Sequence, residues 1–189
     1  PPPPPPPPFF FQAEDVRRDS VASRGRGDVY KRQIIKSFSK LKQKFPNIHL
    51  QIIGDGLYKK NLTEIISNLN LHDQIELIGR VDDEQLKEYY NSCDVYVTAS
   101  TWEFFNLPLL ESMSCGKPVL VSDLPVHQEI ISESHAGKIF TMNGDSFVKE
   151  LEFVLEHYTE LSSNARKFAL KNDWTNMAKR ILEVYDELI

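Results

Sequence analysis

The sequence is poor in cysteine, in long apolar runs and in positive charge. Its two cysteines, Cys93 and Cys115, are too few for a disulfide framework. No apolar stretch approaches the roughly 20 residues that a membrane-spanning helix needs. The formal net charge is −5, whereas a protein that wraps a nucleic-acid backbone needs a basic face. We therefore expect a reduced, cytoplasmic protein that binds no nucleic acid.

The first 33 residues differ in composition from the rest of the chain. They open with eight prolines and hold five of the eight arginines, whereas residues 34–189 are rich in Ile, Leu, Lys and Asn. The stretch FFFQAEDVRRDSVASRGRGDVYKRQ also resembles translated sequencing-adapter DNA. We interpret residues 1–33 as a non-native or disordered segment and exclude them from the fold, as one excludes a tag. The alternative is a polyproline tail that binds an SH3-like partner.

Residues 34–189 are long enough for one domain with its own core. Short apolar runs alternate there with apolar residues at helical spacing; the runs are IHLQIIG, QIELIG, DVYVTAS, KPVLVS and AGKIF. Strands that are apolar on both faces and alternate with helices predict an α/β fold, a Rossmann-like doubly wound parallel sheet. Because a helical pattern, IIKSFSKLKQKFP, opens the domain, we expect its first strand to be missing.

Ligands of doubly wound sheets bind beyond the carboxyl ends of the strands. Four segments follow predicted strands and should converge on one crevice. They are Gly54-Asp55-Gly56, Gly79-Arg80-Val81, residues 100–107 and Ser122-Asp123.

One helix at this crevice has well-marked ends. Asn106 is a favoured N-cap, Pro108 fits the first turn, and Gly116 fits the position just after the helix. The helix start carries unpaired N–H groups and the positive end of the dipole, which favour a phosphate. Glu103 lies before this anion site and Glu111 about one turn inside the helix. Two carboxylates that accept hydrogen bonds on either side of a phosphate site predict a ligand such as a nucleotide-sugar.

The segment EFFNLPLLE resembles the Glu–seven residues–Glu motif of retaining, two-domain (GT-B) glycosyltransferases of the group-1 family, family 4. That motif typically reads E-G-F-G-L-P-x-x-E. The segments LQIIGDG, IELIGRVDDEQLKEYYNSCDVYVTAS, MSCGKPVLVSDLPVHQEI and DWTNMAKRILEVYDELI match the family's usual order. The resemblance implies that residues 34–189 are a partial C-terminal nucleotide-sugar-binding domain, half of a GT-B fold truncated at its N-terminus.

The resemblance also implies a role for each site residue. Glu103 would be catalytic, contacting the transferred sugar and supporting charge at its anomeric centre, and Glu111 would hold the ribose hydroxyls. Other donor contacts implied by the family are backbone amides of Phe105, Asn106 and Leu107 at the diphosphate, Arg80 and Val81 beside the base, and Gly54 and Gly56 where the chain passes close to the donor. The family implies no metal, and no cofactor besides the nucleotide-diphosphate-sugar donor.

The implied activity is that of a retaining, hexosyltransferase-like enzyme of polysaccharide biosynthesis. It would transfer a sugar from a nucleotide-diphosphate-sugar to an acceptor hydroxyl through an oxocarbenium-like transition state. The acceptor, a glycan or lipid-linked molecule, would bind to the missing N-terminal domain, so we expect the chain alone to be inactive. Association with the inner face of the membrane would also reside in that half.

Two other functions are compatible with part of the sequence. One is a nucleotide-sugar epimerase on the same fold. It would need different acid–base residues in the crevice, and the pairing of Glu103 with Glu111 argues against it. A non-catalytic nucleotide- or partner-binding module derived from a glycosyltransferase stays open, because Phe104 and Asn106 stand where the family usually has glycines. If the first of these positions needs a positive φ, Phe104 would be strained. The basic pair that the family uses to hold the diphosphate is also not visible in the sequence.

Overall fold

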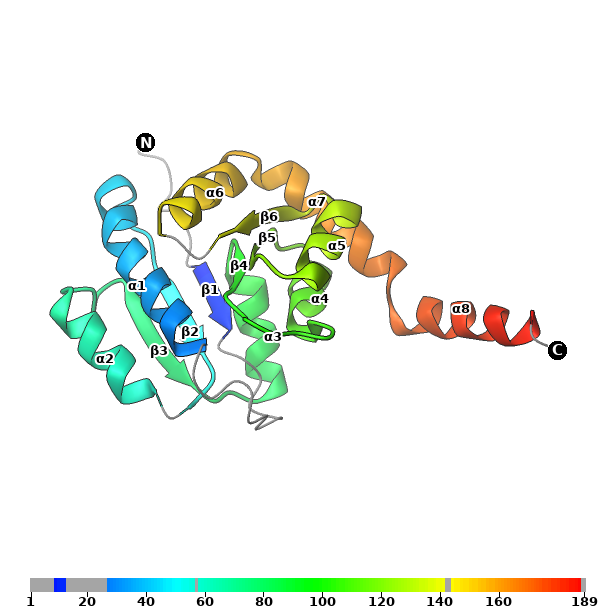
Figure 1. Cartoon of the computed structure of the whole chain (residues 1–189), viewed down its shortest axis with the longest axis horizontal. Helices are drawn as coiled ribbons and strands as arrows, with labels where there is room; N and C mark the ends of the chain where they lie inside the picture. The colour runs from blue at the N-terminus through cyan, green and yellow to red at the C-terminus, as the bar shows by residue number, and fades with distance from the viewer. Residues whose placement is uncertain (1–8, 13–26, 57, 142–143, 188–189) are drawn as a thin grey trace.

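The computed structural model describes residues 9–12, 27–56, 58–141 and 144–187, in which six strands and eight helices follow one another (Figure 1). The strands are β1 (Phe9–Gln12), β2 (Leu50–Ile53), β3 (Ile75–Gly79), β4 (Tyr96–Thr98), β5 (Val119–Ser122) and β6 (Gly137–Phe140). The helices are α1 (Gly27–Lys44), α2 (Lys59–Asn68), α3 (Asp83–Ser92), α4 (Leu107–Ser114), α5 (Pro125–Ser134), α6 (Gly144–Glu156), α7 (Tyr158–Lys171) and α8 (Trp174–Asp186).

The strands form one parallel sheet in the order β3-β2-β1-β4-β5-β6. β1 lies in the middle of the sheet; the chain then fills one half through β2 and β3, and returns past β1 to fill the other half. The order therefore reverses between β1 and β4, and doubly wound sheets bind their ligands at such a reversal. The predicted Rossmann-like doubly wound sheet is confirmed.

The first strand–helix unit differs from the expectation of a missing strand. β1 lies between β2 and β4, with Phe9 in register with Leu50 and Phe10 with Tyr96, and α1 begins at Gly27. Without β1, the facing edges of β2 and β4 would lack backbone partners, and an aromatic segment of high strand propensity fills the gap. The expectation of a fold that starts at residue 34 is thus corrected; the non-native origin of residues 1–33 stays a prediction.

Each face of the sheet is covered by its own apolar core. α1, α2 and α6 pack on one face, where Phe38, Leu62 and Leu151 are buried. α3, α4, α5 and α7 pack on the other, with side chains such as Met113 and Ile130. β5 shows why the strands are apolar on both faces: Leu120 points into the first core, whereas Val119 and Val121 point into the second.

β6 approaches β5 so closely that Gly137 has no room for a side chain. A Cβ atom built there would lie 1.8 Å from the carbonyl oxygen of Val119. The two strands are joined at this level, because the Val119 N–H donates to the carbonyl of Ala136 at 3.1 Å. Position 137 therefore needs glycine because of close packing.

α8 leaves the body of the molecule and extends away from it (Figure 1). None of its residues is buried, and several apolar side chains are more than half exposed; these are Trp174, Leu182, Val184 and Tyr185. Across the described parts of the chain, no helix combines the length and apolar character that a membrane crossing requires.

Candidate functional site

Glu103 lies just beyond the carboxyl end of β4, at the reversal of the strand order. The Ser100 hydroxyl donates to Glu103 Oε1 at 2.8 Å. Ser100 is buried and Glu103 half-buried, so a hydroxyl on the inner side of the loop fixes a carboxylate on its outer side. The structure therefore puts the predicted catalytic residue where doubly wound sheets bind their ligands.

The loop accommodates both residues that replace family glycines. Neither Phe104 nor Asn106 is among the residues with positive φ, and Asn106 has φ −86° and ψ 85°. Phe104 is 79% exposed, and its ring contacts that of Trp102 edge-on with a centroid separation of 4.5 Å. The backbone strain considered for Phe104 is therefore absent.

Asn106 caps α4 as predicted. Its Oδ1 accepts from the Leu109 N–H at 3.2 Å, and Pro108 occupies the first turn. The dihedrals of Asn106 are close to those of an inverse γ-turn, and the Leu107 N–H donates to the Phe105 carbonyl at 3.1 Å. The amide of Leu107, one of the predicted diphosphate contacts, thus already has a partner within the loop.

Glu111 is exposed on α4 and is held from the neighbouring helix. The Tyr90 hydroxyl donates to Glu111 Oε2 at 3.0 Å, and Tyr90 itself is buried. Burial raises the pKa of the Tyr90 phenol well above its usual range, and Tyr96 and Glu111 raise it further. The phenol therefore stays protonated and acts as a donor. Sequence reasoning missed this partner, because the position of Tyr90 on the apolar face of a predicted helix indicates only burial.

A buried chain of hydrogen bonds runs beneath the loop. The Ser122 hydroxyl donates to the Ser100 carbonyl at 2.6 Å, and His127 Nδ1 lies 2.8 Å from the Ser122 carbonyl. Asn106 Nδ2 lies 3.0 Å from His127 Nε2. Burial lowers the pKa of His127, so its ring is neutral, with Nδ1 donating to the carbonyl and Nε2 accepting from Asn106. The chain connects the ends of β4 and β5 to the start of α4.

The other predicted donor contacts follow β2 and β3. Gly54 and Gly79 have φ of 115° and 85°, a region that favours glycine, and the Gly54 N–H donates to the Gly79 carbonyl at 2.8 Å. The loops that carry Gly56 and Arg80 therefore start side by side at the carboxyl ends of these strands. Val81 follows Arg80 in the second loop and is half-buried. A Cβ atom built at Gly79 would meet Lys59 Nζ at 3.3 Å, which places an ammonium group there too.

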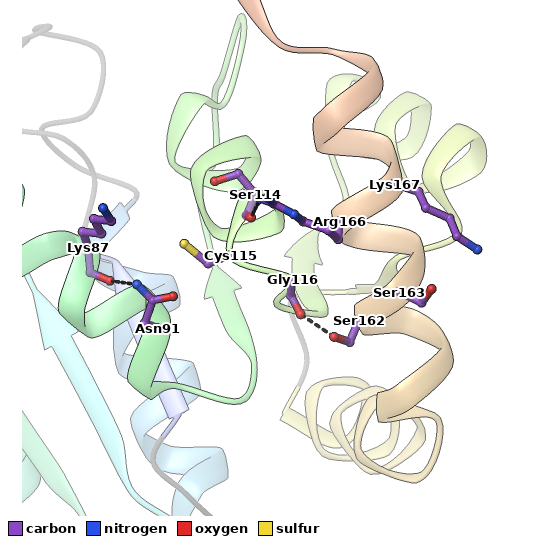
Figure 2. A pocket seen from close by; sticks show the side chains of 9 residues that line it. All are labelled: Lys87, Asn91, Ser114, Cys115, Gly116, Ser162, Ser163, Arg166 and Lys167. Atoms are coloured by element: carbon purple, nitrogen blue, oxygen red, sulfur yellow. Dashed lines mark hydrogen bonds between the residues drawn. The ribbon is translucent and has the colours of Figure 1, made fainter.

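A groove of about 650 Å³ lies at the opposite end of α4, between α3 and α7 (Figure 2). None of the predicted site residues lines it. At its floor, the Arg166 guanidinium donates to the Ser114 carbonyl, and the Ser162 hydroxyl donates to the Gly116 carbonyl at 2.6 Å (Figure 2). These bonds satisfy carbonyls at the end of α4. The residues at this groove therefore stabilise the end of α4, and the groove is separate from the predicted ligand crevice at the carboxyl ends of the strands.

Fold and site together define half of a GT-B fold: a doubly wound sheet whose reversal carries a helix start flanked by two carboxylates. The chain belongs to the family described as glycosyl transferases group 1, which matches residues 19–172. It is 31% identical over 157 residues to an uncharacterized glycosyltransferase of Methanocaldococcus jannaschii, covering 80% of this chain and 40% of that protein. It is 25% identical over 158 residues to the alpha-monoglucosyldiacylglycerol synthase of Streptococcus pneumoniae, covering 82% and 35% of the two chains.

Solved structures show the same fold. HepE of Anabaena, in complex with UDP and glucose, has a TM-score of 0.76 at 20% identity, covering 97% of this chain and 49% of its own. The pneumococcal O-GlcNAc transferase GtfA, in complex with UDP and GlcNAc, has the same TM-score and identity, covering 97% and 36%. This chain thus spans about half or less of the length of the relatives it matches, in keeping with the predicted C-terminal half of a GT-B enzyme. It is a group 1 glycosyltransferase domain.

Proposed function

We propose that the chain is the donor-binding part of a retaining, hexosyltransferase-like glycosyltransferase whose donor is a nucleotide-diphosphate-sugar. The observation that carries this proposal is the pair Glu103 and Glu111. Each is held by a hydroxyl from the fold, and the two lie before and after the start of α4. HepE and GtfA have been solved with UDP and a sugar, which supports a nucleotide-sugar as the ligand.

Each residue has a distinct role in this proposal. The diphosphate binds at the start of α4, where the helix dipole favours an anion and the backbone amides of Phe105 and Asn106 are the proposed contacts. A contact from the Leu107 amide would replace its present bond to the Phe105 carbonyl. Glu111 accepts from the ribose hydroxyls, and Glu103 contacts the sugar and supports positive charge at its anomeric carbon. The bond from that carbon to the diphosphate oxygen breaks, a bond to the acceptor oxygen forms on the same face, and the acceptor hydroxyl gives its proton to the departing diphosphate. Most of the acceleration comes from charges placed around the leaving diphosphate. No metal or further cofactor is needed.

The acceptor site belongs to a part of the enzyme outside this chain. The chain spans 35–41% of the first three curated relatives, and the apolar side of α8 is exposed, which supports a second domain beside it. A glycan or lipid-linked acceptor would bind there, as would any attachment to the inner face of the membrane. The chain alone is then inactive, and the whole enzyme acts in polysaccharide biosynthesis in the cytoplasm.

The first test is calorimetry of the chain with UDP-glucose, UDP, GDP and ADP. We expect at least one of these nucleotides to bind, and Glu111→Ala to weaken binding about tenfold, since a carboxylate that accepts hydrogen bonds contributes about 1.5–3 kcal/mol. Glu133→Ala is the matched control, because Glu133 is an exposed glutamate on α5. Failure of every nucleotide to bind would overturn the donor-binding role.

The second test uses the whole enzyme with its N-terminal half. Glu103→Gln should lower turnover about 100- to 1000-fold, the usual effect of removing one electrostatic contact to a transition state. NMR of the product should show the anomeric configuration of the donor. Inverted product would contradict retention, and turnover near wild type would remove the assigned role of Glu103. Nucleotide binding without transfer by the whole enzyme would favour the alternative, a non-catalytic binding module.

A further inference from the structure

Asn106 buries an amide side chain that needs hydrogen-bond partners in the protein interior. A glycine there, the usual family residue, has no side chain to satisfy, whereas the Asn106 side chain is only 2% exposed. Its Oδ1 is used by the Leu109 N–H, so its Nδ2 faces the protein interior and needs an acceptor. The acceptor is His127 Nε2 at 3.0 Å, on α5 and 21 residues away in the chain.

His127 can fill this role in only one protonation state. Nε2 accepts a hydrogen bond only while it carries no proton, so the ring must be neutral with its proton on Nδ1. The Ser122 carbonyl, 2.8 Å from Nδ1, fixes that tautomer. An apolar side chain at position 127 would fill the same space, but it would leave the Asn106 amide without its acceptor and the Ser122 carbonyl without this donor.

We propose that His127 is a positioning residue of the donor site, which holds the start of α4 in its anion-binding conformation through the side chain of Asn106. This inference rests on the proposed donor-binding function. The other end of the same chain of hydrogen bonds reaches the predicted catalytic carboxylate. The Ser122 hydroxyl donates to the Ser100 carbonyl, and the Ser100 hydroxyl donates to Glu103. His127 is therefore linked both to the start of α4, through Asn106, and to Glu103, through Ser122 and Ser100.

The test is a double-mutant cycle with UDP as the probe, measured by calorimetry. His127→Phe removes both ring hydrogen bonds at similar volume and should weaken UDP binding about tenfold, the effect of leaving a buried polar group unpaired. In an Asn106→Gly background there is no amide left to position, so adding His127→Phe should change the affinity less than about twofold. His127→Gln retains one donor and one acceptor and should restore most of the affinity. His72→Phe is the control, because His72 is an exposed histidine between α2 and β3.

An equal loss in both backgrounds would overturn the proposal, because His127 would then act as a general core residue. No loss in the wild-type background would overturn it as well. NMR of the free chain gives a second measurement that does not depend on nucleotide. Nitrogen shifts of His127 should show a proton on Nδ1 alone, and the Leu109 amide should exchange faster in His127→Phe. A chain that binds none of UDP-glucose, UDP, GDP and ADP but passes both NMR tests would contradict the donor-binding function and leave the positioning of Asn106 standing. A proton on Nε2 would contradict the positioning itself.

Discussion

The hydroxyl of Tyr90 donates to the carboxylate of Glu111 across 3.0 Å, joining a buried side chain of α3 to an exposed one of α4. A long carboxylate on a helix surface samples several rotamers, and fixing one of them loses entropy. Here the Glu111 side chain has already lost this entropy in the free protein, because the protonated phenol of Tyr90 holds one of its carboxylate oxygens. Glu111 is therefore oriented before any ligand arrives.

Tyr90→Phe should weaken nucleotide binding about fivefold, because it removes a hydrogen bond to a charged group that is partly screened by solvent. The measurement is the Kd of UDP by calorimetry, with Tyr185→Phe on the exposed surface of α8 as the control. A Kd for Tyr90→Phe equal to that of the wild type would mean that the orientation of Glu111 does not matter for binding.

Gly137→Ala should lower the free energy of unfolding by about 3 kcal/mol or more, because the added methyl overlaps the Val119 carbonyl and forces β6 away from β5. Chemical denaturation measures this change. Gly56→Ala is the matched control: a Cβ at Gly56 meets nothing within 4 Å, so its effect on stability should stay within about 0.5 kcal/mol. Equal effects of the two substitutions would contradict the close packing of β6.

Arg166→Ala should destabilise the fold by about 1 kcal/mol, since the Ser114 carbonyl at the end of α4 loses its donor. The neighbouring Lys167→Ala is the control, because the Lys167 side chain points away from Ser114 (Figure 2). Thermal unfolding of the two variants compares them directly. A larger loss from Lys167→Ala would show that α7 supports α4 by some other contact.

Asp94 predicts a pH dependence of stability. Burial raises the pKa of this half-buried carboxyl to about 6, although Lys117 lowers it in part. An unfolded aspartate titrates near 3.9, so the unfolded state releases its proton first, and stability falls as pH rises from about 4 through 6. Asp94→Asn should remove this loss and gain about 1 kcal/mol on the wild type above pH 6, allowing for solvent screening.

Urea unfolding of both chains between pH 4 and pH 7.5 measures this difference. His127 acts in the opposite sense: its pKa is lowered, so it destabilises the fold as pH falls below about 6.5. That contribution is present in both chains and cancels in the comparison. A difference between the chains that does not change with pH would contradict the role of Asp94.

Local chemistry predicts most of the fold. Asn106 caps α4, and Gly116, with φ of 70°, follows the helix as expected, because caps and left-handed turns are encoded within a few residues. The missed partners are of another kind. Tyr90 and Glu111 are 21 residues apart, as are Asn106 and His127, and only the packing of separate helices on the sheet brings each pair together. Periodicity indicates that such residues are buried but not what they bind.

β1 was missed for a different reason. Its four residues, Phe9–Gln12, lie in a segment whose prolines and arginines set it apart from the rest of the chain, so composition argued for leaving it out. β1 fills the gap between β2 and β4. This gap becomes visible only when the other strands of the sheet are in place, so local sequence does not predict it.

α4 is an eight-residue helix that is held at both ends. Asn106 caps its start, Arg166 donates to the carbonyl of its last residue, and Ser162 donates to the Gly116 carbonyl just beyond it. A helix this short forms few internal hydrogen bonds and would fray if it stood alone. Because the fold holds it in shape, a nucleotide that meets its first turn orders little chain on arrival. Ordering of the site then subtracts little from the favourable free energy of the attractive contacts, and the rate of association should be set by the approach of the ligand and not by folding of the site.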